Sequence, residues 1–189
     1  MTRAIYYTAA TLNGFLADEH DSLAWLLDIP QEEATADIAD FMSGMGVLVE
    51  GSSTYEWVLR EEDLLVHPGR WQAFYGDRPT FVFTSRSLPV VPGADIRFVS
   101  GPVADHWDDI VASAGGRDVW IVGGGDLAGQ VADAGHLDEI VVTIAPATLR
   151  AGKPLLPRDL DHRRLELIGA RQAGPFAELT YRLVPPSVD

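Results

Sequence analysis

The sequence predicts an α/β protein with a mostly parallel sheet, helices covering it, and antiparallel strands at one edge. Three observations predict this class. Apolar runs of strand length alternate with segments of helical spacing along most of the 189 residues. Two of the runs end in glycine directly before a predicted helix. The chain closes on two neighbouring strand segments around Gly174 and Pro175. Strand–helix alternation is typical of parallel sheets, and adjacent terminal strands add an antiparallel edge.

The N-terminal segments begin this alternation. Residues 5–10 form an apolar run that indicates a buried strand, and Asn13 with Gly14 marks a turn after it. Residues 31–45 carry apolar side chains at helical spacing, so a helix is expected there. Residues 47–50 form a short strand that stops at a glycine.

The middle of the chain continues the pattern. Ser53 followed by Glu56 has the form of a capping box, which predicts the start of a helix. Residues 80–84 and 96–99 are expected strands. Residues 103–114 are an expected helix, because a proline precedes apolar residues at helical spacing.

The C-terminal part contains one more helix and four more strands. The strand at 118–122 runs into three glycines, and the helix at 126–134 follows them. A strand at 137–145 comes next. The strands at 165–171 and 177–184 form the predicted terminal hairpin.

The composition indicates a globular protein, and we expect one domain over residues 1–189. A net charge of −14 repels polyanions, so nucleic acid is not an expected partner. The absence of cysteine excludes thiolate nucleophiles and disulfides. The sequence shows neither a signal peptide nor an apolar run long enough to cross a membrane, so a cytoplasmic location without membrane partners is expected.

The first candidate ligand-binding junction is Gly51, between the strand at 47–50 and the next helix. In open α/β sheets, ligands bind beyond the carboxyl ends of the strands. The start of the helix offers unpaired N–H groups and a positive dipole end, which suit a pyrophosphate. An ordinary capped helix is the alternative interpretation.

The second candidate is the triple glycine at 123–125. Three glycines cost conformational entropy, and one would suffice for a turn. The excess predicts that a cofactor packs against bare backbone, with a purely structural turn as the alternative. The spacing is not G-x-G-x-x-G, so this loop is not a Rossmann fingerprint.

The third candidate is Thr84, Ser85 and Arg86, at the end of another strand. Two hydroxyls and a guanidinium can hold a phosphate through charge-assisted hydrogen bonds. A solvated strand end with a surface arginine is the alternative. The five histidines lack metal-ligand spacing, so no metal is expected. The motifs of serine hydrolases and P-loop kinases do not occur in the sequence.

Taken in order, these junctions resemble the dihydrofolate reductase superfamily. The closer resemblance is to bacterial dihydrofolate-reductase-like proteins and to the reductase domain of the riboflavin-biosynthesis deaminase/reductase. Residues 7–17 are similar to the first strand and active-site loop of this superfamily, and residues 51–55 to its G-R-x-T-[YW] phosphate site. Residues 122–125 are similar to its [IV]-G-G-G loop. Residues 143–146 and 152–156 are similar to a segment of the riboflavin-type reductases.

The resemblance implies a three-layer dihydrofolate-reductase-like fold, NADPH as the cofactor and a homodimer. It places the cofactor against Ala10, Leu16, Gly51, Ser52, Ser53, Thr54, Thr84, Ser85, Arg86, Val122, Gly123, Gly124, Gly125, Asp126 and Leu127. It places a small-molecule substrate against Trp25, Glu32 and Lys153, and the chemistry at Asp28 and Thr143.

Two positions depart from the family pattern. Ser52 stands where the family has arginine, so one anchor for the adenosine end is missing, for which Arg86 can compensate. The carboxylate that holds the pterin in dihydrofolate reductases has no counterpart in register after Trp25. Asp28 lies in an apolar setting and is the preferred candidate for a carboxylate that faces the cleft. Glu32 is the alternative.

The expected activity is hydride transfer from NADPH to a C=N or C=O carbon of a small heterocycle, with the proton from a carboxylate or water. One alternative is a folate reductase. Another is the 5-amino-6-ribosylaminouracil-phosphate reductase of riboflavin biosynthesis, which needs a cation for the substrate phosphate, at Lys153 or Arg150. A third is a non-catalytic, dimeric nucleotide-binding protein of the same fold.

Overall fold

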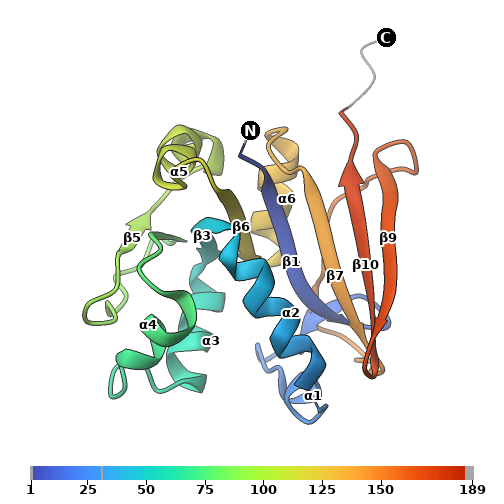
Figure 1. Ribbon diagram of the computed structural model, residues 1–189, viewed down its shortest axis with the longest axis horizontal. Helices are drawn as coiled ribbons and strands as arrows, with labels where there is room; N and C mark the ends of the chain where they lie inside the picture. Colours follow the sequence, from blue (N-terminus) through green and yellow to red (C-terminus); the bar gives the residue numbers. More distant parts are fainter. Residues whose placement is uncertain (1, 31, 186–189) are drawn as a thin grey trace.

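The central sheet follows the predicted class. The computed structural model describes residues 2–30 and 32–185, with side chains in residues 2–30 and 38–185. In this part of the chain, eight strands form one sheet in the order β5-β4-β3-β6-β1-β7-β10-β9 (Figure 1). Six of them pair in parallel: β1 (Ala4–Thr11), β3 (Met45–Gly51), β4 (Thr80–Phe83), β5 (Ile96–Val99), β6 (Asp118–Gly123) and β7 (Glu139–Ala145). The antiparallel strands β9 (Leu165–Ala173) and β10 (Phe176–Leu183) complete the sheet and confirm the terminal hairpin.

The middle strands are apolar on both faces because helices cover both sides of the sheet. Val47, Leu48 and Val49 of β3 are completely buried. Successive side chains of a strand point to opposite faces. Val47 and Val49 therefore pack into the core on one face, and Leu48 into the core on the other. A continuous apolar run is the expected signature of a parallel strand buried on both faces.

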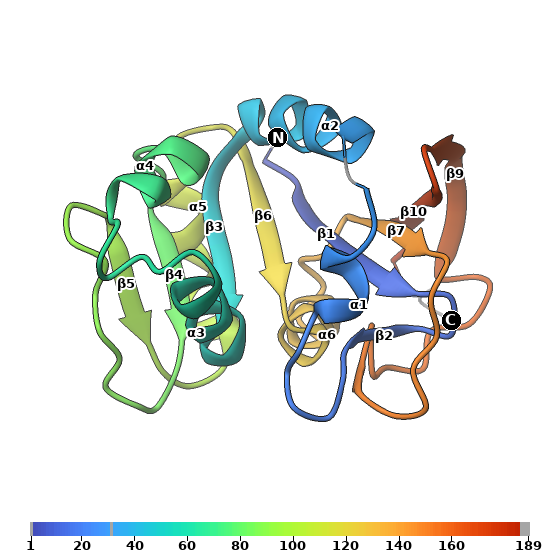
Figure 2. The ribbon, with the colours of Figure 1, turned by 90° about the horizontal axis from the view of Figure 1, so that it is seen from below.

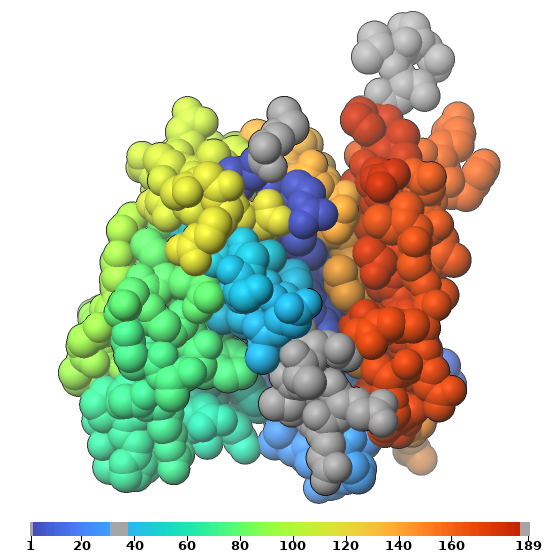
Figure 3. Space-filling view, viewed as in Figure 1, coloured from blue at the N-terminus to red at the C-terminus, as the bar shows by residue number. Residues whose placement is uncertain are grey.

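Each core lies between the sheet and its own set of helices, which gives three layers. The first face is covered by the 3-10 helix η1 (Val103–His106), α5 (Trp107–Ser113) and α6 (Gly125–Asp133). The second face is covered by α2 (Glu32–Ser43), α3 (Ser52–Glu61) and α4 (Gly69–Tyr75). The helices of the second face lie in front of the sheet in Figure 1, and Figure 3 shows β9 and β10, in orange and red, as one flank of the molecule.

Four short elements were not expected from the sequence. They are β2 (Phe15–Ala17), α1 (Ala24–Leu27), α4 and β8 (Lys153–Pro154). β2 and β8 pair only with each other, across more than half the chain, and so leave no local periodicity. The helix expected at 103–114 is divided into η1 and α5. In the described part of the chain, no helix combines the length and apolar character that a membrane span requires.

Candidate active site

A cavity of about 650 Å³ opens at the carboxyl ends of the parallel strands. Residues of β1, β3, β4, β6 and β7 contribute to its wall, and these strands are neighbours in the sheet. Figure 2 shows α1, α3 and α6 grouped around the ends of β3 and β6. The position and size are typical of a small-molecule site in an α/β protein.

The junction of β3 and α3 brings the start of a helix to the cavity wall. The wall residues here are Gly51, Ser52, Ser53 and Thr54. Gly51 is the N-cap in an extended conformation, and no side chain in the described residues caps the helix. The predicted capping box is therefore wrong, and Glu56 pairs with Arg86 instead. The N–H groups of the first turn remain available to a ligand, because they have no partner within the helix.

The three glycines between β6 and α6 have three different surroundings. Gly123 has a φ of +148°, a conformation that side chains disfavour. A Cβ on Gly125 would lie 2.3 Å from the carbonyl oxygen of Leu155, so packing against the β8 segment requires glycine. A Cβ on Gly124 would meet no described atom within 4 Å, and Gly124 lines the cavity. Gly124 is therefore the position where bare backbone faces open space.

The two junctions lie against each other and direct both helix starts at the same cavity. A Cβ on Gly51 would lie 3.8 Å from the carbonyl oxygen of Gly123. The wall around α6 is formed by Val122, Gly123, Gly124, Gly125, Asp126 and Leu127. Two helix N-termini and open backbone fit the doubly negative pyrophosphate of a nicotinamide cofactor.

The predicted phosphate segment at the end of β4 lies outside the cavity wall. Phe83 lines the cavity, whereas Thr84, Ser85 and Arg86 do not. Oγ1 of Thr84 accepts a hydrogen bond from the backbone N–H of Arg86 at 2.9 Å. The guanidinium of Arg86 binds the carboxylate of Glu56, one turn into α3. The arginine is thus close to the start of α3, but its charge is partly neutralised.

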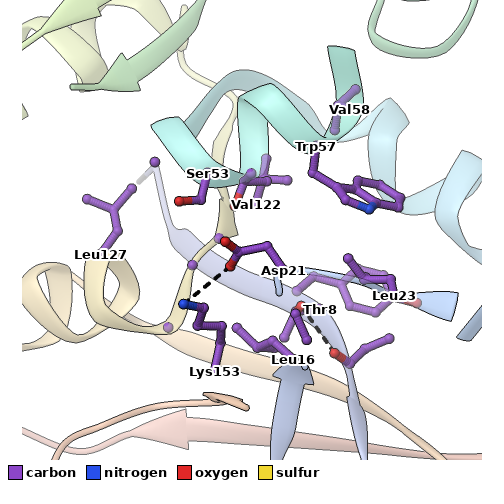
Figure 4. A pocket seen from close by; sticks show the side chains of 18 of the residues that line it. Thr8, Leu16, Asp21, Leu23, Ser53, Trp57, Val58, Val122, Leu127 and Lys153 are labelled. Carbon is purple, nitrogen blue, oxygen red and sulfur yellow. Dashed lines mark hydrogen bonds and ion pairs between the residues drawn. The ribbon is translucent and has the colours of Figure 1, made fainter. Parts of the chain in front are cut away.

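Two residues predicted to act on the substrate side reach the cavity. Thr143 of β7 lines it while remaining 7% exposed. Lys153 also lines it, and its Nζ lies 3.5 Å from Oδ1 of Asp21, which sequence reasoning did not single out (Figure 4). Leu16 is part of the wall, whereas Ala10 is buried outside it.

Aromatic side chains form another part of the wall that the sequence did not reveal. Of the seven aromatic residues that line it in the described part of the chain, Phe83 lies in β4 and Phe176 in β10. The other five are Tyr7, Trp57, Phe74, Tyr75 and Trp120, from two strands and two helices. We call these five residues the aromatic wall. Figure 4 shows Trp57 and Leu23 on the side of the cavity opposite Leu127. The cavity therefore combines a region of helix starts with a region suited to flat rings.

Comparison with known proteins gives the family. The family model of the RibD C-terminal domain matches residues 3–177. The chain belongs to this family. The uncharacterised protein YwjB of Bacillus subtilis (strain 168) is 28% identical over 179 residues, which cover 95% of this chain and 97% of YwjB.

Solved structures confirm the fold that the resemblance implies for this RibD C-terminal domain protein. A protein of Shewanella sp. PV-4 assigned to riboflavin biosynthesis has a TM-score of 0.78 and 23% identity, with 97% of this chain and 100% of that chain covered. Dihydrofolate reductase of Enterococcus faecalis, solved with NADP(H), has a TM-score of 0.58 and 16% identity, with 96% of each chain covered.

Asp28, the preferred candidate for the substrate carboxylate, does not line the cavity of this RibD C-terminal domain protein. Leu23 and Leu26 line the cavity, whereas Trp25 and Asp28 do not. Asp28 is exposed at the C-cap of α1. Two residues advance a helix by about 200°, so Asp28 faces away when Leu26 faces inward. The expectation that Asp28 faces the cleft is therefore wrong.

Glu32, the alternative to Asp28, has its side chain outside the residues whose side chains the structure describes. In the described residues, no group of three or more histidine, aspartate or glutamate side chains could hold a metal ion.

Glu50 is a buried carboxyl group that sequence reasoning passed over. It is the residue before Gly51, and it is 2% exposed. Its Oε1 is buried and has no hydrogen-bond partner among the described residues. Burial raises the pKa of Glu50 to about 8, so this carboxyl group is largely protonated at neutral pH. A glutamate at the end of an apolar strand is the signal that could have identified it.

Proposed function

We propose that the protein is an NADPH-dependent reductase that transfers a hydride to a C=N or C=O carbon of a small heterocycle. The observation that supports this most is the convergence of two helix starts and the bare backbone of Gly124 on one cavity. Membership of the RibD C-terminal domain family agrees with a reductase. A dihydrofolate reductase of the same fold was solved with NADP(H).

In this proposal, the backbone of the two junctions holds the cofactor. The N–H groups of residues 52–54 and 124–126 bind the pyrophosphate. Arg86, with Thr84 and Ser85, binds the ribose 2′-phosphate outside the cavity wall. The guanidinium leaves Glu56 for the phosphate, which carries the larger negative charge. Bound NADPH supplies the hydride, and the protein supplies position and electrostatics.

Thr143 is the residue that we propose to orient the substrate. Its side chain reaches the cavity from β7, and its hydroxyl can both donate and accept a hydrogen bond. With Asp28 directed away, the proton comes from water or from a group in the wall.

A second candidate is the 5-amino-6-ribosylaminouracil-phosphate reductase activity, which the family favours and which would use Lys153 for the substrate phosphate. The test incubates the protein with NADPH and either this pyrimidine or dihydrofolate, and follows the loss of nicotinamide absorbance. Saturable NADPH binding with turnover of one compound is expected. Failure to bind NADPH at millimolar concentration would contradict the proposed function.

A further inference from the structure

The charges on the cavity wall limit which substrates it can hold. Among the described residues that line it, three are charged at neutral pH: Asp21, Asp126 and Lys153. The two carboxylates outnumber the one ammonium group. Lys153 is paired with Asp21 at 3.5 Å. Asp126 is paired at 3.1 Å with Arg158, which does not line the cavity.

A substrate phosphate would need more positive charge than this wall offers. A phosphomonoester carries about −1.5 to −2 charges at pH 7 and is held by arginine, lysine or helix starts. The proposed function assigns the starts of α3 and α6 to the cofactor pyrophosphate. α1 has four residues and provides no comparable site. Among the described residues of the wall, Lys153 is the remaining cation. Asp21 lies 3.5 Å from its Nζ and itself lines the cavity, so a phosphate bound to Lys153 would meet a carboxylate in the wall.

The aromatic wall has the opposite character and suits an uncharged ring. Trp57 and Tyr75 lie in it with Trp120, and the rings of Tyr75 and Trp120 have centroids 6.3 Å apart. The side chains of Leu23 and Ile38 extend the same apolar surface. Such a surface binds a flat molecule through its faces and excludes water.

We propose that the substrate is a flat aromatic or heteroaromatic molecule without a phosphate, and that Asp21 is the residue that selects against phosphorylated analogues. This inference rests on the proposed function, because it assigns both helix starts to the cofactor. It separates this chain from a reductase of a sugar phosphate. Asp21 has a φ of +60°, a conformation that asparagine also tolerates, so the charge can be removed without changing the loop.

The test uses a matched pair of probes, 2-naphthol and 2-naphthyl phosphate, with the protein saturated by NADP⁺. Binding is followed by isothermal titration calorimetry, because both probes absorb and fluoresce in the range of the five tryptophans of the chain. The wild type is expected to bind 2-naphthol at least about tenfold more tightly than the phosphate, because like charges oppose the phosphate. Asp21→Asn should tighten the phosphate by roughly threefold or more and leave 2-naphthol unchanged. Asp105→Asn, which removes an exposed carboxylate in η1, is the matched control and should change neither.

Three outcomes would overturn the proposal: tighter binding of the phosphate by the wild type, no binding of 2-naphthol, or an equal effect of Asp21→Asn and Asp105→Asn. Saturation with NADP⁺ is measured first and separately. Failure at that step refutes the cofactor assignment, whereas failure of the probe comparison refutes only the substrate class.

Discussion

At the residue scale, Glu50 couples the stability of the protein to pH. Its pKa is about 8 in the folded protein, against 4.5 as the ordinary value. The folded state therefore holds this proton more tightly than the unfolded state. The contribution of Glu50 is most favourable below pH about 4.5 and is lost as the pH rises through about 8. Glu50→Gln should remove this loss and stabilise the protein at pH 8 by roughly 2 to 4 kcal/mol relative to its effect at pH 5.

Urea unfolding at the two pH values measures this difference. Glu61→Gln, at an exposed position on α3, is the control and should show no such dependence. An equal change in the free energy of unfolding for Glu50→Gln at pH 5 and pH 8 would show that Glu50 is not protonated in the folded protein.

Arg86 and Glu56 give a second prediction at this scale, about the choice between NADPH and NADH. Arg86→Ala should weaken NADPH binding by roughly tenfold, the effect of losing about 1.5 kcal/mol from a charged hydrogen bond. Glu56→Gln should strengthen it, because the guanidinium is released and a like charge is removed. NADH, which lacks the 2′-phosphate, is the built-in control. Equal effects on both cofactors, measured as dissociation constants, would disprove the assignment of the phosphate to Arg86.

Residues of the cavity differ in how far the sequence could identify them. Gly124 and Ser52 are marked by their place between a strand and a helix, which predicts that each lies at the carboxyl edge of the sheet. Asp21 and Trp57 carry no such mark. Their side chains reach the cavity through the path of a loop and the rotation of a helix, and neither is encoded in a short motif. The prediction for Asp28 was wrong for the same reason, because the apolar neighbours of Asp28 in the sequence do not determine where its side chain points.

At the element scale, the proposed cofactor site depends on the two strand-to-helix junctions, and a substitution at Gly124 tests it. Gly124→Val should weaken NADPH binding by at least about tenfold, because a branched side chain would occupy ligand space. Folding should persist, since a Cβ there meets no described atom within 4 Å. Fluorescence titration of NADPH measures the effect.

Gly69→Val is the matched control for this substitution. A Cβ on Gly69 likewise meets no described atom within 4 Å, and Gly69 does not line the cavity. This variant should bind NADPH like the wild type. Unchanged affinity in a folded Gly124→Val protein would remove the cofactor from the triple glycine.

Among the elements, those with a long apolar run were predictable and those held by distant contacts were not. β3 and β6 were expected because a parallel strand buried on both faces is apolar throughout. α4 has only seven residues, and its buried Trp71 and Tyr75 give too short a pattern to distinguish it from a loop. The capping box failed because Ser53 is not the N-cap; the chain enters the helix through Gly51.

At the scale of the whole molecule, a net charge of −14 opposes the binding of an anionic cofactor. Binding therefore depends on local positive features such as helix starts. The sheet places two helix starts at one edge, because β3 and β6 are neighbours and run in the same direction. The alternation of segments predicted such a parallel sheet but not its strand order. That order brings Thr143 and the aromatic wall to the same cavity, and it depends on contacts between segments far apart in the sequence.

A crystal structure of the protein with NADPH tests the proposed cofactor site most directly. We expect the pyrophosphate to lie within hydrogen-bond distance of backbone N–H groups of residues 52–54 and 124–126. We expect the nicotinamide ring to lie in the cavity between Leu16, Thr143 and the aromatic wall. A pyrophosphate bound elsewhere, or a cofactor that leaves the two helix starts in contact with solvent, would contradict the assignment of the cofactor to the two junctions.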